Sequence, residues 1–129
     1  MSERMRVVDL DTPALLVDLE RMESNLRRMA GYFVGGRAKL RPHFKAHQVL
    51  SLATRQVQEG AIGITCARLA QAEALVGEGI RNVLIASEIA GERLIRRFVE
   101  LSRLAPVIVA VDDSRVVADM ARFATGSRR

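Results

Sequence analysis

Short β-rich runs alternate along the chain with stretches of helical spacing. The apolar pattern predicts strands at residues 14–18, 40–44, 62–66, 83–86 and 107–111. After each of them, apolar residues recur at the spacing of a helix that buries one face. From the second strand onward the strands recur about every 20–25 residues, the period of the strand–helix units that build a parallel sheet. The pattern therefore predicts an α/β fold.

Glycine and capping residues mark the helix ends. Glu59-Gly60 and Glu78-Gly79 each come shortly before a strand, and glycine just past a helix supplies the left-handed turn that returns the chain to the sheet. Asp112-Asp113-Ser114 is a capping sequence for the last helix.

Two architectures fit these elements. Five strand–helix units suit a flavodoxin-like doubly wound sheet, complete at this length. The same units suit about the first half of a (β/α)₈ TIM-type barrel, which needs about 250 residues to close. The pattern alone slightly favours the doubly wound sheet.

Composition narrows the class of protein. The chain has 129 residues, 49% apolar and 27% charged, the balance of one globular domain or of a piece of a larger one. The net charge is +5, but the basic residues are spread over every predicted helix, so no nucleic-acid partner is expected. The apolar runs are too short to span a membrane. A single cysteine, Cys66, and the lack of an apolar leader predict a cytoplasmic location.

The chemistry is concentrated at residues 40–47. In an extended chain Arg41, His43 and Lys45 share one face, and three basic groups there favour an anionic or polar ligand. Lys45 is expected at the carboxyl edge of the sheet, where parallel α/β folds place their active sites. A deprotonated lysine amine there can condense with an aldehyde. From spacing alone, a lysine that merely reaches solvent is the favoured interpretation.

Other candidate sites carry less chemistry. His43 and His47 are four residues apart, a zinc-binding spacing on a helix, but no third ligand accompanies them, so we expect no metal site in this chain. Cys66 ends an apolar strand and is expected to be buried and inert. Glu88 and Asp112 end two strands, and Asp112 fits a helix cap equally well.

Three segments are similar to one known family: Asp11-Thr12-Pro13-Ala14-Leu15-Leu16-Val17-Asp18-Leu19, Arg41-Pro42-His43-Phe44-Lys45-Ala46-His47, and Val83-Leu84-Ile85-Ala86-Ser87-Glu88. They resemble the D-threonine aldolase / D-serine dehydratase-like family. Its Arg-Pro-His-x-Lys-Thr-His motif carries pyridoxal phosphate (PLP) on the lysine. Ala46 departs from the usual threonine of the motif.

The resemblance implies the alanine-racemase type of fold, a PLP-binding (β/α)₈ barrel joined to a C-terminal β domain. Residues 1–129 would be the N-terminal part of the barrel domain, with residues 11–18 a strand of the β domain. Lys45 would be the Schiff-base lysine, and Arg41, His43 and His47 would lie near the cofactor. A divalent metal is expected in the full-length protein, through residues outside this chain.

The implied function is that of a PLP-dependent lyase of D-amino acids, of the D-threonine aldolase or D-serine dehydratase type. A homodimer is expected at full length, and these residues alone are expected to be inactive, because they amount to half a barrel. An amino-acid racemase and a non-catalytic PLP-binding protein of the same barrel type are alternatives. A non-enzymatic flavodoxin-like interaction domain is a further one.

Overall fold

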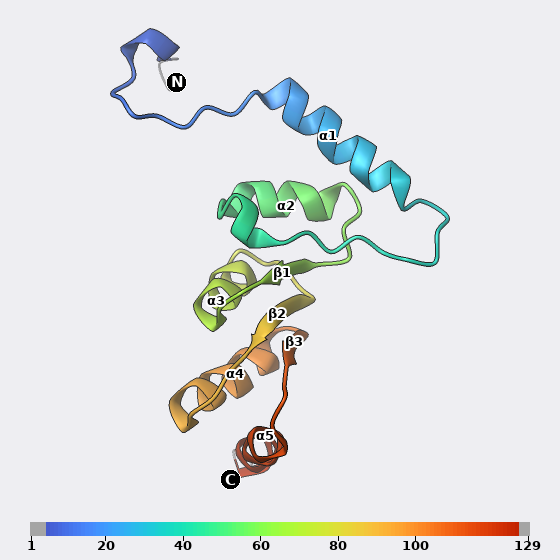
Figure 1. Ribbon diagram of the computed structural model, residues 1–129, viewed down its shortest axis with the longest axis vertical. Coiled ribbons are helices and arrows are strands. Elements are labelled where there is room, and N and C mark those ends of the chain that lie inside the picture. Colours follow the sequence, from blue (N-terminus) through green and yellow to red (C-terminus); the bar gives the residue numbers. More distant parts are fainter. Residues whose placement is uncertain (1–4, 127–129) are drawn as a thin grey trace.

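The computed structural model describes residues 5–126, and what was expected of residues 1–4 and 127–129 lies outside this part of the chain. Figure 1 shows the elements succeeding one another along the long axis of the molecule, from α1 to α5. The elements are η1 (Val7–Asp9), α1 (Leu19–Tyr32), η2 (Phe44–Ala46), α2 (Leu50–Gln58), β1 (Ile64–Cys66), α3 (Leu69–Gly77), β2 (Val83–Glu88), α4 (Glu92–Leu104), β3 (Val107–Ala110) and α5 (Ser114–Gly126), where η denotes a 3₁₀ helix.

The three strands form a parallel sheet in the order β1-β2-β3. Val83 of β2 lies beside Ile64 on one side and beside Val107 on the other. Gly60 (φ +108°) and Gly79 (φ +88°) adopt the left-handed conformation expected where a helix ends and the chain returns to the sheet.

Residues 40–44 continue the sheet on the free side of β1. The carbonyl of Leu40 accepts a hydrogen bond from the Ile62 N–H at 2.9 Å, and the carbonyl of Pro42 accepts one from the Thr65 N–H at 2.7 Å. The segment forms a single parallel bridge, at His43. The predicted strand is thus an extended edge segment over residues 40–43, and Phe44 already belongs to η2.

The strands lie side by side across the sheet in the order in which they occur in the sequence. Residues 40–44 are followed by β1, β2 and β3, without the reversal of strand order that defines a doubly wound sheet. Val83 and Ile85 of β2 are buried with α3 in the core, whereas Ile108, of the opposite phase in β3, is 49% exposed. Helices therefore cover one face of the sheet, as in a barrel wall. The partial (β/α)₈ class is confirmed, and the flavodoxin-like alternative is wrong.

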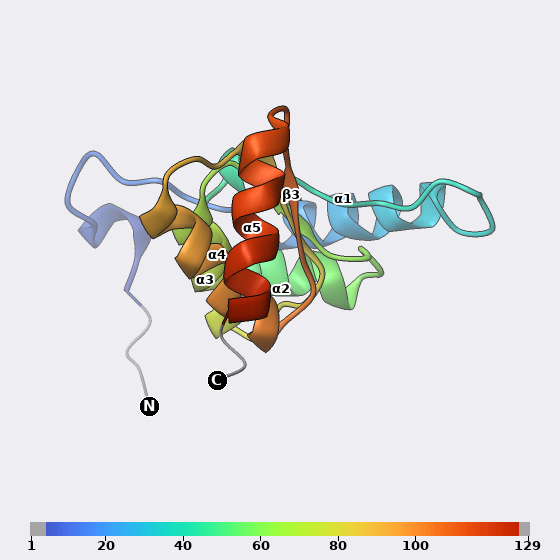
Figure 2. The same ribbon diagram turned by 90° about the horizontal axis from the view of Figure 1, so that it is seen from below.

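The first predicted strand differs from the pattern. Residues 14–18 are extended, but within residues 5–126 they pair with no other strand, and Leu15 is 92% exposed. α1, which follows, buries none of its residues fully. Figure 2 shows α1 and the loop after it projecting away from the helices around the sheet. An alternating apolar run gives a strand only where another strand offers its backbone groups. Pairing with a β domain stays a prediction.

A hydrogen-bonded clamp closes the amino edge of the sheet. The Arg41 guanidinium donates to the backbone carbonyl of Asn82 and to its Oδ1, the latter at 3.0 Å. Asn82 in turn donates from Nδ2 to the carbonyl of Ile62 at 2.7 Å. Gly63 lies directly under this clamp, where an added Cβ would stand 1.9 Å from the Asn82 carbonyl oxygen. The edge segment, β1 and β2 are therefore tied together by two side chains, Arg41 and Asn82, and by one close backbone contact.

This contact makes Gly63 the most restrictive glycine of the sheet. We expect Gly63→Ala to lower the free energy of unfolding by about 1–3 kcal/mol, because the backbone of Asn82 has to move. Urea unfolding monitored by circular dichroism measures the change. The matched control is Gly77→Ala at the end of α3, where nothing lies within 4 Å of the added methyl group. Alanine there should be neutral or stabilising by up to about 1 kcal/mol. Equal changes in the free energy of unfolding for the two substitutions would contradict the close contact between Gly63 and Asn82.

Candidate active site

Lys45 lies in η2, just after the extended segment 40–43 ends, at the carboxyl edge of the sheet. Its neighbour Phe44 is 5% exposed and belongs to the core, whereas the Lys45 side chain is exposed. Phe44 therefore anchors the turn η2 while Lys45 points into solvent. Among residues 5–126, Lys45 makes one hydrogen bond to a side chain, and it donates this bond from its backbone N–H to His43. Its Nζ makes no hydrogen bond there and is therefore available to a ligand.

The alternation expected for Arg41, His43 and Lys45 holds only as far as His43. His43 is extended (ψ 121°), and the next three residues form η2, so Lys45 has left the extended chain. Arg41 is engaged by Asn82 at the amino edge. The structure brings His43, Lys45 and His47 into one turn and leaves Arg41 at the opposite edge of the sheet.

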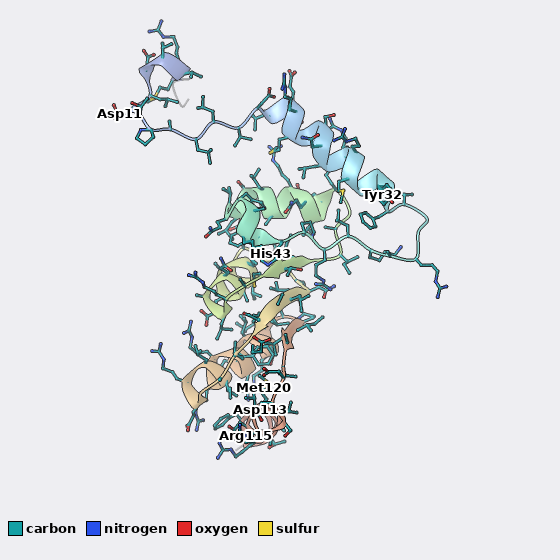
Figure 3. The ribbon with its side chains drawn as sticks, in the orientation of Figure 1. Asp11, Tyr32, His43, Asp113, Arg115 and Met120 are labelled. Atoms are coloured by element: carbon teal, nitrogen blue, oxygen red, sulfur yellow. The ribbon has the colours of Figure 1, made fainter. Side chains whose placement is uncertain are left out.

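The two histidines of this turn make the same local contact. The His43 Nδ1 accepts a hydrogen bond from the Lys45 N–H at 3.1 Å, and the His47 Nδ1 accepts one from the Val49 N–H at 3.0 Å. On its other side, His47 places Nε2 at 3.3 Å from Oε1 of Gln56 in α2. Figure 3 labels His43 beside β1, near the middle of the molecule.

The surroundings of His43 favour its neutral form. Burial, and secondly the positive charge of Lys45, lower the pKa of His43 below its ordinary value. The neutral imidazole has one nitrogen without a proton, and that nitrogen can accept the backbone N–H.

The next loop along the carboxyl edge is held by side chains that the sequence analysis missed. Ser87, near the end of β2, donates its hydroxyl proton to the carbonyl of Ala67, and Gln71 accepts a hydrogen bond from the Ala67 N–H at 3.0 Å. Both backbone groups of Ala67 are thus fixed just after β1. No spacing in the sequence distinguishes Ser87 or Gln71 from other polar residues near strand ends.

Two cavities lie among the helices, and one of them borders the Lys45 turn. One of about 530 Å³ lies between α3 and α4 in the outer helical layer, with Leu101 and Leu104 in its lining. Another, of about 310 Å³, lies between α1 and α2 and borders the Lys45 turn, with Met29, His43 and Ala46 in its lining. Neither lining includes Lys45, so the candidate site is the exposed edge itself.

Among residues 5–126, none of the remaining candidate side chains is hydrogen-bonded to Lys45. Asp113 caps α5 by accepting from the Arg115 N–H at 2.8 Å, and Figure 3 places both residues at the α5 end of the molecule, far from His43. Glu88 and Asp112 are exposed. Among residues 5–126, no three His, Cys, Asp or Glu side chains gather into a possible metal site. None of the helices described here is long and apolar enough to cross a membrane.

Comparison with known proteins decides the family. The model of the family "Alanine racemase, N-terminal domain" matches residues 17–127. The chain belongs to this family. It is 34% identical over 113 residues to a D-threonine aldolase from Arthrobacter sp, and the match covers 88% of this chain and 30% of that protein.

Solved structures of relatives superpose on nearly the whole chain. The crystal structure of D-threonine aldolase from Filomicrobium marinum matches with a TM-score of 0.88 and 38% identity, over 93% of this chain and 32% of that one. D-threo-3-hydroxyaspartate dehydratase from Delftia sp. HT23 matches with a TM-score of 0.80 and 31% identity, over 91% and 31%. The chain thus spans about a third of these relatives. The resemblance inferred from the sequence is confirmed.

Cys66 offers a test of the buried side of the site. Burial raises the pKa of the Cys66 thiol to about 11, and its side chain is fully buried. At pH 8 the folded protein should therefore react with iodoacetamide at least about 100-fold more slowly than the urea-unfolded chain. Mass spectrometry of timed samples measures both rates. Similar rates in the two states would show that the strand end at Cys66 opens to solvent.

Proposed function

We propose that this chain is the cofactor-bearing part of a PLP-dependent lyase that cleaves or dehydrates a D-amino acid with a hydroxyl group on Cβ. The observation that carries the proposal is the exposed amine of Lys45, on a rigid turn at the carboxyl edge of a parallel sheet. Relatives named for D-threonine and D-threo-3-hydroxyaspartate support the substrate class.

The residues of the turn fit an aldehyde-bearing cofactor. Lys45 is one of only two lysines in the chain, and its Nζ is available for condensation with an aldehyde. His43 uses Nδ1 on the backbone, so in its neutral form its Nε2 carries a proton that could be donated to a ligand. A contact between Arg41 and the cofactor would require the guanidinium to leave Asn82. The hydrogen bonds from the Arg41 guanidinium to Asn82 therefore support a structural role for Arg41.

When bound, PLP supplies a ring that withdraws electrons from the bond broken at the substrate Cα. The protein then has to orient that bond and to move one proton. The Lys45 Nζ, once free as an amine, can accept or return this proton. Its exposed position, one residue beyond the buried Phe44, lets the amine move while its backbone stays fixed.

The other parts of the proposal concern the whole protein. A divalent metal would be held by side chains other than those between residues 5 and 126, where no ligand cluster is found. Residues 11–18 would pair with a β domain, and the working form would be a cytoplasmic homodimer. A racemase or a PLP carrier without turnover would share the Lys45 bond. The products that the intact protein forms from a D-3-hydroxy amino acid distinguish a lyase, a racemase and a carrier without turnover.

The first test is the site of covalent attachment. We expect PLP followed by borohydride reduction to label Lys45, because reduction converts the reversible bond between amine and aldehyde into a stable one. Peptide mapping by mass spectrometry locates the label. The chain offers a matched control, since Lys39 donates to the carbonyl of Gly36 at 3.3 Å and lies before the edge segment.

Lys39→Arg should therefore leave labelling intact, and Lys45→Arg should abolish it. A label that persists in Lys45→Arg, or that moves with Lys39, would overturn the assignment.

A further inference from the structure

The Lys45 turn contains a repeated imidazole contact. His43 and His47 each accept, at Nδ1, the backbone N–H of the residue two positions ahead, at 3.1 and 3.0 Å. The second imidazole also lies edge-on to the buried ring of Phe44, with ring centroids 5.6 Å apart. The contact therefore joins the turn to the core on one side and to α2 on the other, through Gln56.

The backbone donors of the turn explain why two imidazoles are needed. Every N–H from residue 45 to residue 49 is hydrogen-bonded within the turn. Backbone carbonyls of residues 43 and 44 accept the three central donors, and the imidazoles accept the first and the last, from Lys45 and Val49. Unpaired backbone donors would let the turn open to water. The imidazoles thus close a network that the carbonyls leave incomplete.

The same network holds a strained residue. Gln48 has a φ of +54°, which is uncommon for a residue with a side chain, and its N–H donates to the carbonyl of Phe44 at 2.8 Å. A conformation of this kind persists only where its surroundings fix it. Val49, the residue after it, is the N-cap residue of α2, and its N–H is the one that His47 accepts. Loss of that contact would release Gln48 and the start of α2 together.

We propose that His43 and His47 are positioning residues, which hold the backbone on both sides of Lys45 through Nδ1, and that Gln56 sets the orientation of His47. The proposal deepens the proposed function and rests on it in one respect, that Lys45 is the reacting amine. Each imidazole acts as a hydrogen-bond acceptor for the backbone, and its Nε2 is the nitrogen that carries the proton. Gln56 Oε1 accepts from that nitrogen of His47.

Asparagine distinguishes this role from a chemical one. An asparagine side chain accepts the backbone N–H two residues ahead, as the imidazole does here, but it neither gives nor takes a proton at neutral pH. His43→Asn and His47→Asn should therefore restore what His43→Ala and His47→Ala lose. Gln56→Met is a third variant, which removes the hydrogen bond at His47 Nε2 and keeps both imidazoles in the chain.

The first readout is amide hydrogen exchange in the full chain without PLP, measured residue by residue by NMR. We expect His43→Ala to speed exchange at the Lys45 N–H by about tenfold, and His47→Ala to do the same at Val49. The Asn variants should return both to near the wild-type rate. Gln56→Met should speed exchange at Val49 alone. Unchanged amide rates in the Ala variants would overturn the proposal. The amide of Ile85 in the core is the internal control for folding.

The second readout is the rate at which PLP and borohydride label Lys45. We expect the Ala variants to be labelled about tenfold more slowly, because the amine is no longer held in one place, and the Asn variants to recover. Asn variants that protect the amides but fail to recover labelling would show that the imidazoles act chemically. If an Ala variant does not fold, amide exchange and Lys45 labelling in the Asn and Gln56→Met variants, compared with the wild type, still test the positioning role.

The two readouts separate the two claims. If the wild-type chain is not labelled at Lys45 but the amide pattern is as expected, the proposed function fails and the positioning role stands. If labelling occurs at Lys45 and the amide pattern is absent, the proposed function stands and the positioning role fails.

Discussion

The parallel register of residues 40–44 against β1 is the constraint on which the site depends. The Pro42 carbonyl accepts the Thr65 N–H at 2.7 Å, and Arg41 is bound to Asn82 at the other end of the segment. Moving the segment by one residue would turn each side chain to the opposite face of the sheet. Phe44 would then leave the core, and the amine of Lys45 would lose its place at the carboxyl edge.

Two neighbouring residues of the turn, Phe44 and Lys45, have different roles. Phe44 is buried in the core and fixes where the extended segment ends, while Lys45 is exposed and leaves its Nζ free to react. The chain changes from extended to 3₁₀ geometry between His43 and Phe44, and imidazoles supply the acceptors that this change requires. The positive charge of Lys45 is one reason why the pKa of His43 is lowered, so the amine itself helps to keep its neighbour neutral.

The sequence predicted the positions of the helices and strands better than it predicted which parts of the chain they contact. Strands β1, β2 and β3 and the five α-helices of residues 5–126 stand where periodicity places them. The strands and α2, α3 and α4 pack in one local core, whereas α1 and α5 bury no residue fully. The strand expected at residues 14–18 is absent, since periodicity shows a face to bury and not what it pairs with. Spacing put Lys45 at the correct edge, but it also put Arg41 on the same face of an extended chain. The contact with Asn82 spans 41 residues and could not be read from local pattern.

The most direct measurement is a crystal structure of the intact polypeptide grown with pyridoxal phosphate. We expect continuous electron density from the Lys45 Nζ to the aldehyde carbon of the cofactor, with both imidazoles still accepting the backbone N–H groups of Lys45 and Val49. Cofactor density joined to Lys39, or a Lys45 side chain turned away from a cofactor bound elsewhere, would contradict it.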